Sequence, residues 1–156
     1  MTSPEQAYKP FKKGSYLIDT FLLILICLAG FSCYFTYDIP ATVDIDIKEN
    51  LKIETDKFMT YFYTAYSFPS AITAMLSGYI ISSMGMGKGG VILALFLTLA
   101  HVLLGYSMYA RVGILACLGR IIHGAASEPF GVVRSAFTAK YFNSALFYGL
   151  ILAFSR

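Results

Sequence analysis

The chain has 156 residues, of which 57% are apolar and only 13% are charged, with a formal net charge of +3. A typical soluble domain carries about 25% charged residues, so this composition indicates a chain embedded in a lipid bilayer. It argues against a soluble enzyme domain, a disordered tail and a nucleic-acid-binding module, since the last would need a concentrated basic stripe. The three cysteines stand in apolar runs, and no metal-ligand spacing is present. We therefore expect no disulfide scaffold, no metal and no other cofactor.

Five apolar stretches predict membrane-spanning helices, because a span needs about 20 mostly apolar residues. In chain order they cover residues 16–37, 55–83, 89–109, 112–137 and 141–156. The fifth stretch is about fifteen residues long, which is too short to span comfortably. We therefore interpret 16–156 as a partial set of about 4.5 helices of an all-α, multi-pass membrane protein, cut inside its last helix.

The lysines predict the orientation of these helices, because cytosolic loops carry an excess of Lys and Arg. Lys9, Lys12 and Lys13 lie in the tail 1–15, and Lys88 and Lys140 fall in short connections on the same side of the bilayer. The connection 38–54 reads as a long polar loop and is acidic on balance. We expect tail 1–15 in the cytosol and loop 38–54 on the lumenal or extracellular side.

The stretch 112–137 carries its charges on one helical face. At 100° per residue, a sector of about 120° contains Arg120, Gly124, Ser127, Glu128, Gly131 and Arg134. Charges at membrane depth usually face a bundle interior or an aqueous path, so Arg120 and Glu128 are candidate cavity residues. A structural ion pair with another helix is the alternative. Arg134 should lie near the cytosolic end, where a snorkelling anchor is the default interpretation.

Other polar side chains leave two interpretations open. His123 and His101 could each relay protons, or each could be a packed, hydrogen-bonded histidine. Tyr63 and Tyr66 share a face of the stretch 55–83, and they form either a cavity wall suited to amide and charged groups or an aromatic packing stripe. No nucleophile elbow or phosphate-binding loop is visible, so we do not expect an enzyme.

Several segments carry a resemblance to a known family. A Gly-rich loop after Gly78, and Gly119-Arg120 followed by Gly124, resemble the N-terminal half of a major facilitator superfamily transporter. Within that superfamily the lysosomal dipeptide transporter branch is similar in YDIPA, TDKFMTYFYTAYSFPS, GRIIHGAASE and YGLILAFSR. The resemblance implies a lysosomal or vacuolar membrane, twelve helices in two halves, and a substrate site between the halves near midplane.

The resemblance also implies residue roles. Glu128 and Arg156 match the positions that engage the charged termini of a peptide in that branch, whereas Arg134 stands where the branch usually has an uncharged polar residue. We add Tyr63 and Tyr66 as substrate-binding candidates. Gating or coupling is expected of Arg120, His123 and Gly124.

Two hypotheses of function follow. The first is a fragment of a secondary transporter that moves small zwitterionic solutes, such as dipeptides, by alternating access. The second is a transport-inactive, truncated membrane protein that acts as a partner or structural subunit of another membrane protein through its open helix faces. On either hypothesis the partners are the bilayer and a zwitterionic solute or an accessory membrane subunit.

Overall fold

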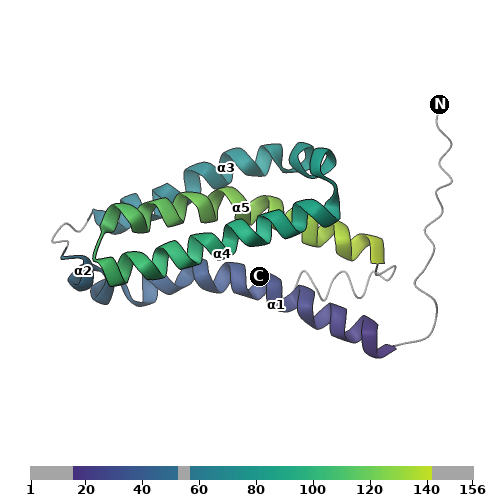
Figure 1. Ribbon diagram of the computed structural model, residues 1–156, viewed down its shortest axis with the longest axis horizontal. Coiled ribbons are helices and arrows are strands. Elements are labelled where there is room, and N and C mark those ends of the chain that lie inside the picture. The colour runs from purple at the N-terminus through teal and green to yellow at the C-terminus, as the bar shows by residue number, and fades with distance from the viewer. Residues whose placement is uncertain (1–15, 53–56, 142–156) are drawn as a thin grey trace.

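The computed structural model describes residues 16–52 and 57–141, and in these ranges every element is a helix. The elements are α1 (Tyr16–Thr42), α2 (Asp44–Leu51), α3 (Phe58–Met84), α4 (Met86–Ala110) and α5 (Gly113–Tyr141). The predicted all-α fold class is therefore confirmed. The four long helices lie lengthwise beside one another and alternate in direction along the chain (Figure 1). The predicted helix 141–156 falls outside the described residues, except for Tyr141 at the end of α5.

The segment expected to be a polar loop contains helical structure, so that expectation was wrong. α1 runs on to Thr42, and α2 follows after one residue. Ile47 and Leu51, one turn apart on α2, are buried against Phe62 and Ala116. Lys48 forms a 3.0 Å ion pair with Asp44 on the same short helix. The apolar pair Ile47 and Leu51 packs at the end of the bundle, which explains why a polar segment adopts a helix there.

Helix α5 is the centre of the bundle. It packs closely along both α3 and α4, and Figure 1 shows it between them. Small residues make this possible: Gly119 lies where an added Cβ would be 3.0 Å from the Ala100 carbonyl oxygen of α4. Gly124 lies so close to α3 that an added Cβ would overlap the carbonyl oxygen of Tyr66. Glycines at such positions allow helix backbones to approach closely in membrane proteins.

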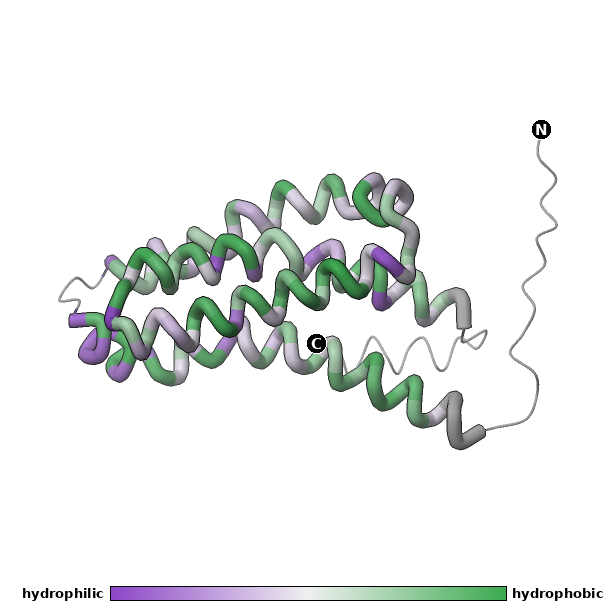
Figure 2. Tube along the Cα trace, viewed as in Figure 1, coloured by the Kyte–Doolittle hydropathy of each residue, from purple (hydrophilic) through white to green (hydrophobic). Residues whose placement is uncertain are grey.

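The four long helices differ in polarity. The segment Thr20–Thr42 of α1 and the whole of α4 are long and apolar enough to cross a membrane. Helices α3 and α5 have similar lengths but carry more polar residues, and in Figure 2 hydrophilic positions interrupt α5 along its length. The two more polar helices pack against each other, and each has buried polar side chains: Ser70 and Ser77 on α3, and Arg120, His123 and Thr138 on α5.

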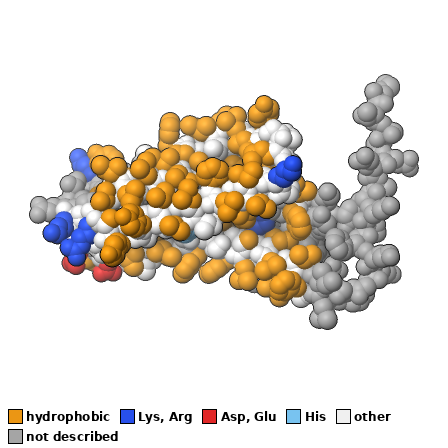
Figure 3. Space-filling view, in the orientation of Figure 1, with side chains coloured by type: hydrophobic (Ala, Val, Ile, Leu, Met, Phe, Trp, Pro, Cys, Tyr) orange, Lys and Arg blue, Asp and Glu red, His pale blue; other side chains and the backbone are white. Residues whose placement is uncertain are grey.

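The outer surface is largely apolar. Met75, Tyr109 and Ile114 are 88%, 86% and 77% exposed. In Figure 3 apolar side chains cover the middle of the visible face, while charged side chains gather at its ends. A water-soluble bundle of this size rarely exposes so continuous an apolar band, whereas a bilayer covers it without cost.

Candidate functional site

Arg120 lies in the first half of α5 and is only 1% exposed. Its guanidinium carbon is 4.6 Å from the ring centre of Phe62, 5.5 Å from that of Tyr63 and 6.0 Å from that of Tyr37. One nitrogen, Nη2, donates a hydrogen bond to the Tyr37 carbonyl oxygen at 3.3 Å. Nε and Nη1 are buried and have no hydrogen-bond partner among the described residues.

The aromatic rings of α1 and α3 therefore surround this cation. A desolvated cation–π contact stabilises by about 2 kcal/mol, so three rings offset part of the cost of burying Arg120. Within the described ranges Arg120 forms no ion pair. The predicted interior position of Arg120 is observed, and its partners are rings rather than a carboxylate.

Two histidines from different helices lie beside Arg120. The ring of His123 on α5 is 5.2 Å from that of His101 on α4, and also 5.2 Å from that of Tyr66. His123 is 3% exposed, and its Nε2 has no partner among the described residues, whereas Nδ1 of His101 contacts the Leu97 carbonyl oxygen. A cavity of about 10 Å³, close to the volume that holds one water, lies between the histidines and Arg120.

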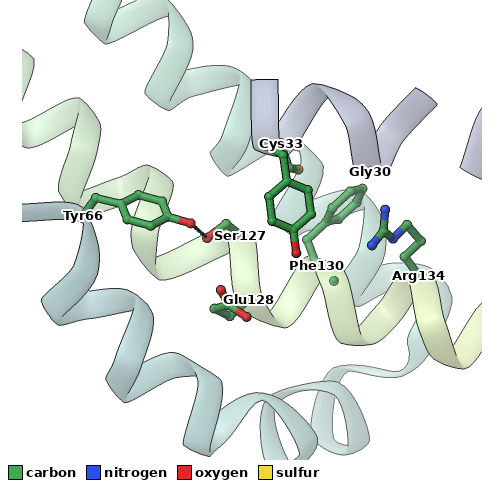
Figure 4. A pocket seen from close by; sticks show the side chains of 9 residues that line it. Gly30, Cys33, Tyr66, Ser127, Glu128, Phe130 and Arg134 are labelled. Atoms are coloured by element: carbon green, nitrogen blue, oxygen red, sulfur yellow. Dashed lines mark hydrogen bonds between the residues drawn. The ribbon is translucent and has the colours of Figure 1, made fainter. Parts of the chain in front are cut away.

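A second polar region lies farther along α5, where a pocket of about 40 Å³ opens between α1, α3 and α5 (Figure 4). In this pocket the Tyr66 hydroxyl forms a 3.0 Å hydrogen bond with the Ser127 hydroxyl. Glu128 is exposed, and its Oε1 accepts a 3.4 Å hydrogen bond from Ser70. The pocket is lined by Gly30, Cys33, Tyr34, Tyr66, Ser127, Glu128, Phe130, Gly131 and Arg134.

Arg134 belongs to this pocket as well. Its Nη1 is buried and has no hydrogen-bond partner in the described part of the chain. In the view of Figure 4, Arg134 and Glu128 lie on opposite sides of Phe130, with the guanidinium directed toward α1. The pocket thus contains one acidic and one basic side chain from the same helix, and neither is in an ion pair with a described residue.

The predicted site residues separate into these two regions. Tyr66 and Glu128 lie at the pocket, whereas Tyr63 contacts Arg120 and Tyr37 and is not among the pocket-lining residues. Gly124 lies in the α3–α5 contact, and His123 lies beside Arg120. Arg156 lies outside the described residues.

Sequence reasoning did not assign Tyr37, Phe62 or Cys33 to either region, and it named His101 and His123 without pairing them. Tyr37 and Phe62 complete the rings around Arg120, His101 faces His123, and Cys33 lines the pocket. The helical periodicity of one segment gives no information on which residue of another helix lies opposite. The aromatic motif around Tyr63 was the only available signal for the rings.

A helical bundle with a largely apolar surface, two helices apolar enough to cross a membrane and a buried Arg120 is typical of an all-α, multi-helix membrane protein. The chain is similar to several proteins named lysosomal dipeptide transporter MFSD1. The Bos taurus protein is 30% identical over 139 residues, which cover 86% of this chain and 30% of that protein. The Homo sapiens protein is 28% identical over the same shares of the two chains. The Danio rerio protein is 27% identical over 159 residues, 99% of this chain and 34% of that protein.

These similarities confirm the resemblance to the lysosomal dipeptide transporter branch of the major facilitator superfamily. The chain spans about a third of the length of the curated relatives it matches. No protein-family model matches the chain. No solved structure matches it either.

Proposed function

We propose that the chain is part of a secondary transporter that moves small zwitterionic solutes, such as dipeptides, across a lysosomal or vacuolar membrane by alternating access. One observation carries this proposal: the described pocket contains an acidic and a basic side chain within an apolar bundle. Unpaired charges at membrane depth are costly, and they usually mark a substrate or ion pathway. The names of the relatives support the same class of solute.

Glu128 is proposed to bind the ammonium group of the solute. It is exposed at the mouth of the pocket, and its bond from Ser70 is long, so an incoming cation can displace that hydroxyl without a large loss. Tyr66 presents its hydroxyl on the same wall, where it can bond to a peptide group. By resemblance to the branch, Arg156 is proposed to hold the carboxylate.

The other predicted residues are proposed to act in gating or coupling rather than in binding. Arg120 and His123 are buried between helices and do not line the pocket. Gly124 allows α3 and α5 to touch backbone to backbone, so a relative movement of these helices would change the contact at that residue. In this proposal Tyr63 supports the position of Arg120 and reaches a solute only when the helices move.

The test is uptake and binding by the protein expressed from its native reading frame. Glu128→Gln keeps the size of the side chain and removes its charge, so we expect about a tenfold or greater loss of affinity for Ala-Ala. N-acetylated Ala-Ala, which lacks the ammonium group, should bind wild-type and variant equally weakly. Glu49→Gln, on the exposed side of α2, is the matched control and should change nothing.

Normal uptake by Glu128→Gln contradicts the assignment of this residue. Equal binding of acetylated and free Ala-Ala by the wild-type protein contradicts the zwitterion proposal as a whole. The runner-up function, a transport-inactive subunit, predicts no saturable uptake and copurification with one membrane protein. Broad apolar exposure on α3, including Phe68 at 68% and Tyr79 at 76%, offers a surface for such a partner, although lipid covers it equally well.

A further inference from the structure

The guanidinium of Arg134 has no ion-pair partner among the described residues. Its Nη1 is buried without a hydrogen-bond partner, and no described carboxylate pairs with it. A snorkelling side chain keeps its charged group in water or among lipid headgroups. Here the guanidinium is instead directed toward α1 beside a pocket that it lines (Figure 4). Arg134 is half-buried and has no ion-pair partner among the described residues, so its guanidinium is available to an anionic group of a ligand that enters this pocket.

The dimensions of the pocket indicate which part of a ligand enters it. A volume of about 40 Å³ is too small for a whole peptide and suits a single planar group such as a carboxylate. Space remains beside Arg134, since an added Cβ on Gly131 would meet nothing within 4 Å. Glu128 lines the same pocket but is exposed, so the opposite end of the same ligand can reach it where the pocket opens.

We propose that Arg134 binds the carboxylate of the zwitterion whose ammonium group Glu128 binds, so that α5 alone holds both ends of the solute. This inference rests on the proposed function and adds a residue that the resemblance does not supply. The planar guanidinium can bind both carboxylate oxygens. Arg134 then provides a carboxylate contact within the described part of the chain, in addition to the contact proposed for Arg156.

The spacing along α5 also selects the length of the solute. Six residues of α-helix rise about 9 Å, and the longer arginine side chain, inclined toward the helix N-terminus, shortens the gap to Glu128 by a few ångströms. Each extended peptide residue adds about 3.3–3.6 Å, so a chain of two or three residues fits. A free amino acid carries both charged groups on one carbon and is too short to contact both side chains.

The experiment measures binding of tritiated Ala-Ala to the protein expressed from its native reading frame and purified in detergent. The variants are Arg134→Gln, Arg134→Lys and Arg156→Gln, with Arg111→Gln as the control. Arg111 is exposed at the turn between α4 and α5, away from the pocket. Ala-Ala amide, which lacks the carboxylate, and free alanine are the comparison ligands.

We expect Arg134→Gln to weaken Ala-Ala binding about tenfold or more and to leave the weaker binding of Ala-Ala amide unchanged. Arg134→Lys should lose part of the affinity for Ala-Ala but none of the affinity for Ala-Ala amide. If Arg134→Gln does not fold, this variant alone tests the role of Arg134. Free alanine should compete poorly, and Arg111→Gln should resemble the wild-type protein.

The inference is overturned if the Arg134 variants lose equal affinity for Ala-Ala and Ala-Ala amide, or if neither variant loses affinity for Ala-Ala. If only Arg156→Gln removes the preference for the acid over the amide, Arg134 is not the carboxylate-binding group, and the proposed function stands. If the wild-type protein itself does not distinguish acid from amide, the proposed function fails together with this inference.

Discussion

The contact between α3 and α5 at Gly124 provides the sharpest test of the fold. In Gly124→Ala the new Cβ would lie 2.9 Å from the carbonyl carbon and 3.1 Å from the Cα of Tyr66, and it would overlap the carbonyl oxygen. All three atoms are backbone, so no side chain can rotate away. The two helices must separate locally, which would also disturb the Tyr66–Ser127 hydrogen bond one turn away.

Overpacking costs about 1–3 kcal/mol, and contact with backbone favours the upper end of that range. Alanine regains about 1 kcal/mol of helix propensity relative to glycine, which leaves a net loss of about 2 kcal/mol. Gly131→Ala on the same helix is the matched control, because an added Cβ there meets nothing within 4 Å. The control should gain up to about 1 kcal/mol, so the two variants should differ by about 3 kcal/mol.

Thermal unfolding in detergent, followed by circular dichroism, measures this difference. For a chain of this length 1 kcal/mol shifts Tm by about 2–4 °C, so the two variants should unfold about 6–12 °C apart. Equal Tm values for Gly124→Ala and Gly131→Ala would refute the close approach of α3 and α5 at this position.

Three further predictions concern the buried polar groups and the topology. Arg120→Met should leave Tm unchanged or raise it, because an apolar side chain of similar length avoids the cost of burying a cation, while uptake is lost; normal uptake would exclude a role for Arg120 in coupling. Tyr66→Phe should lower stability by about 0.5–1.5 kcal/mol through its 3.0 Å bond to Ser127, and Ser127→Ala should add little in the double variant; fully additive losses would argue against that bond. Glycosylation acceptors inserted at Asn50 and Lys88 should be modified at 50 alone, and the reverse pattern would invert the proposed orientation.

The long apolar segments were the most predictable part of the fold. The prediction placed a helix at 89–109, and α4 runs from Met86 to Ala110, since a continuous apolar run bounded by glycines and a charged residue leaves few alternatives. The segment after residue 37 was harder. Its polar composition suggested a loop, but Ile47 and Leu51 pack on Phe62 of α3. That contact depends on tertiary structure, which local composition does not encode.

In the candidate site, too, positions within one helix could be predicted from the sequence, whereas contacts between helices could not. Periodicity predicts Arg120 and Glu128 within one sector of α5, because residues of one helix have a fixed angular relation, but it does not predict that Arg120 is buried while Glu128 is exposed. It could not reveal that His101 faces His123, since that depends on the relative position of α4 and α5. Each histidine was interpreted alone, and only the packed bundle shows them as a pair beside Arg120.

Tyr66 connects the two polar regions of α5. Its hydroxyl bonds to Ser127 in the pocket, while its ring contacts His123 at 5.2 Å and Tyr37 at 4.6 Å. The Tyr37 carbonyl in turn accepts a hydrogen bond from the Arg120 guanidinium. A solute that bonds to the Tyr66 hydroxyl in place of Ser127 therefore acts on a side chain whose ring contacts Tyr37 and His123, both neighbours of Arg120. Tyr66→Phe keeps the ring and removes the hydroxyl, so it separates the two contributions. If binding at the pocket is coupled to Arg120 through this side chain, Tyr66→Phe should weaken that coupling even where solute affinity is retained.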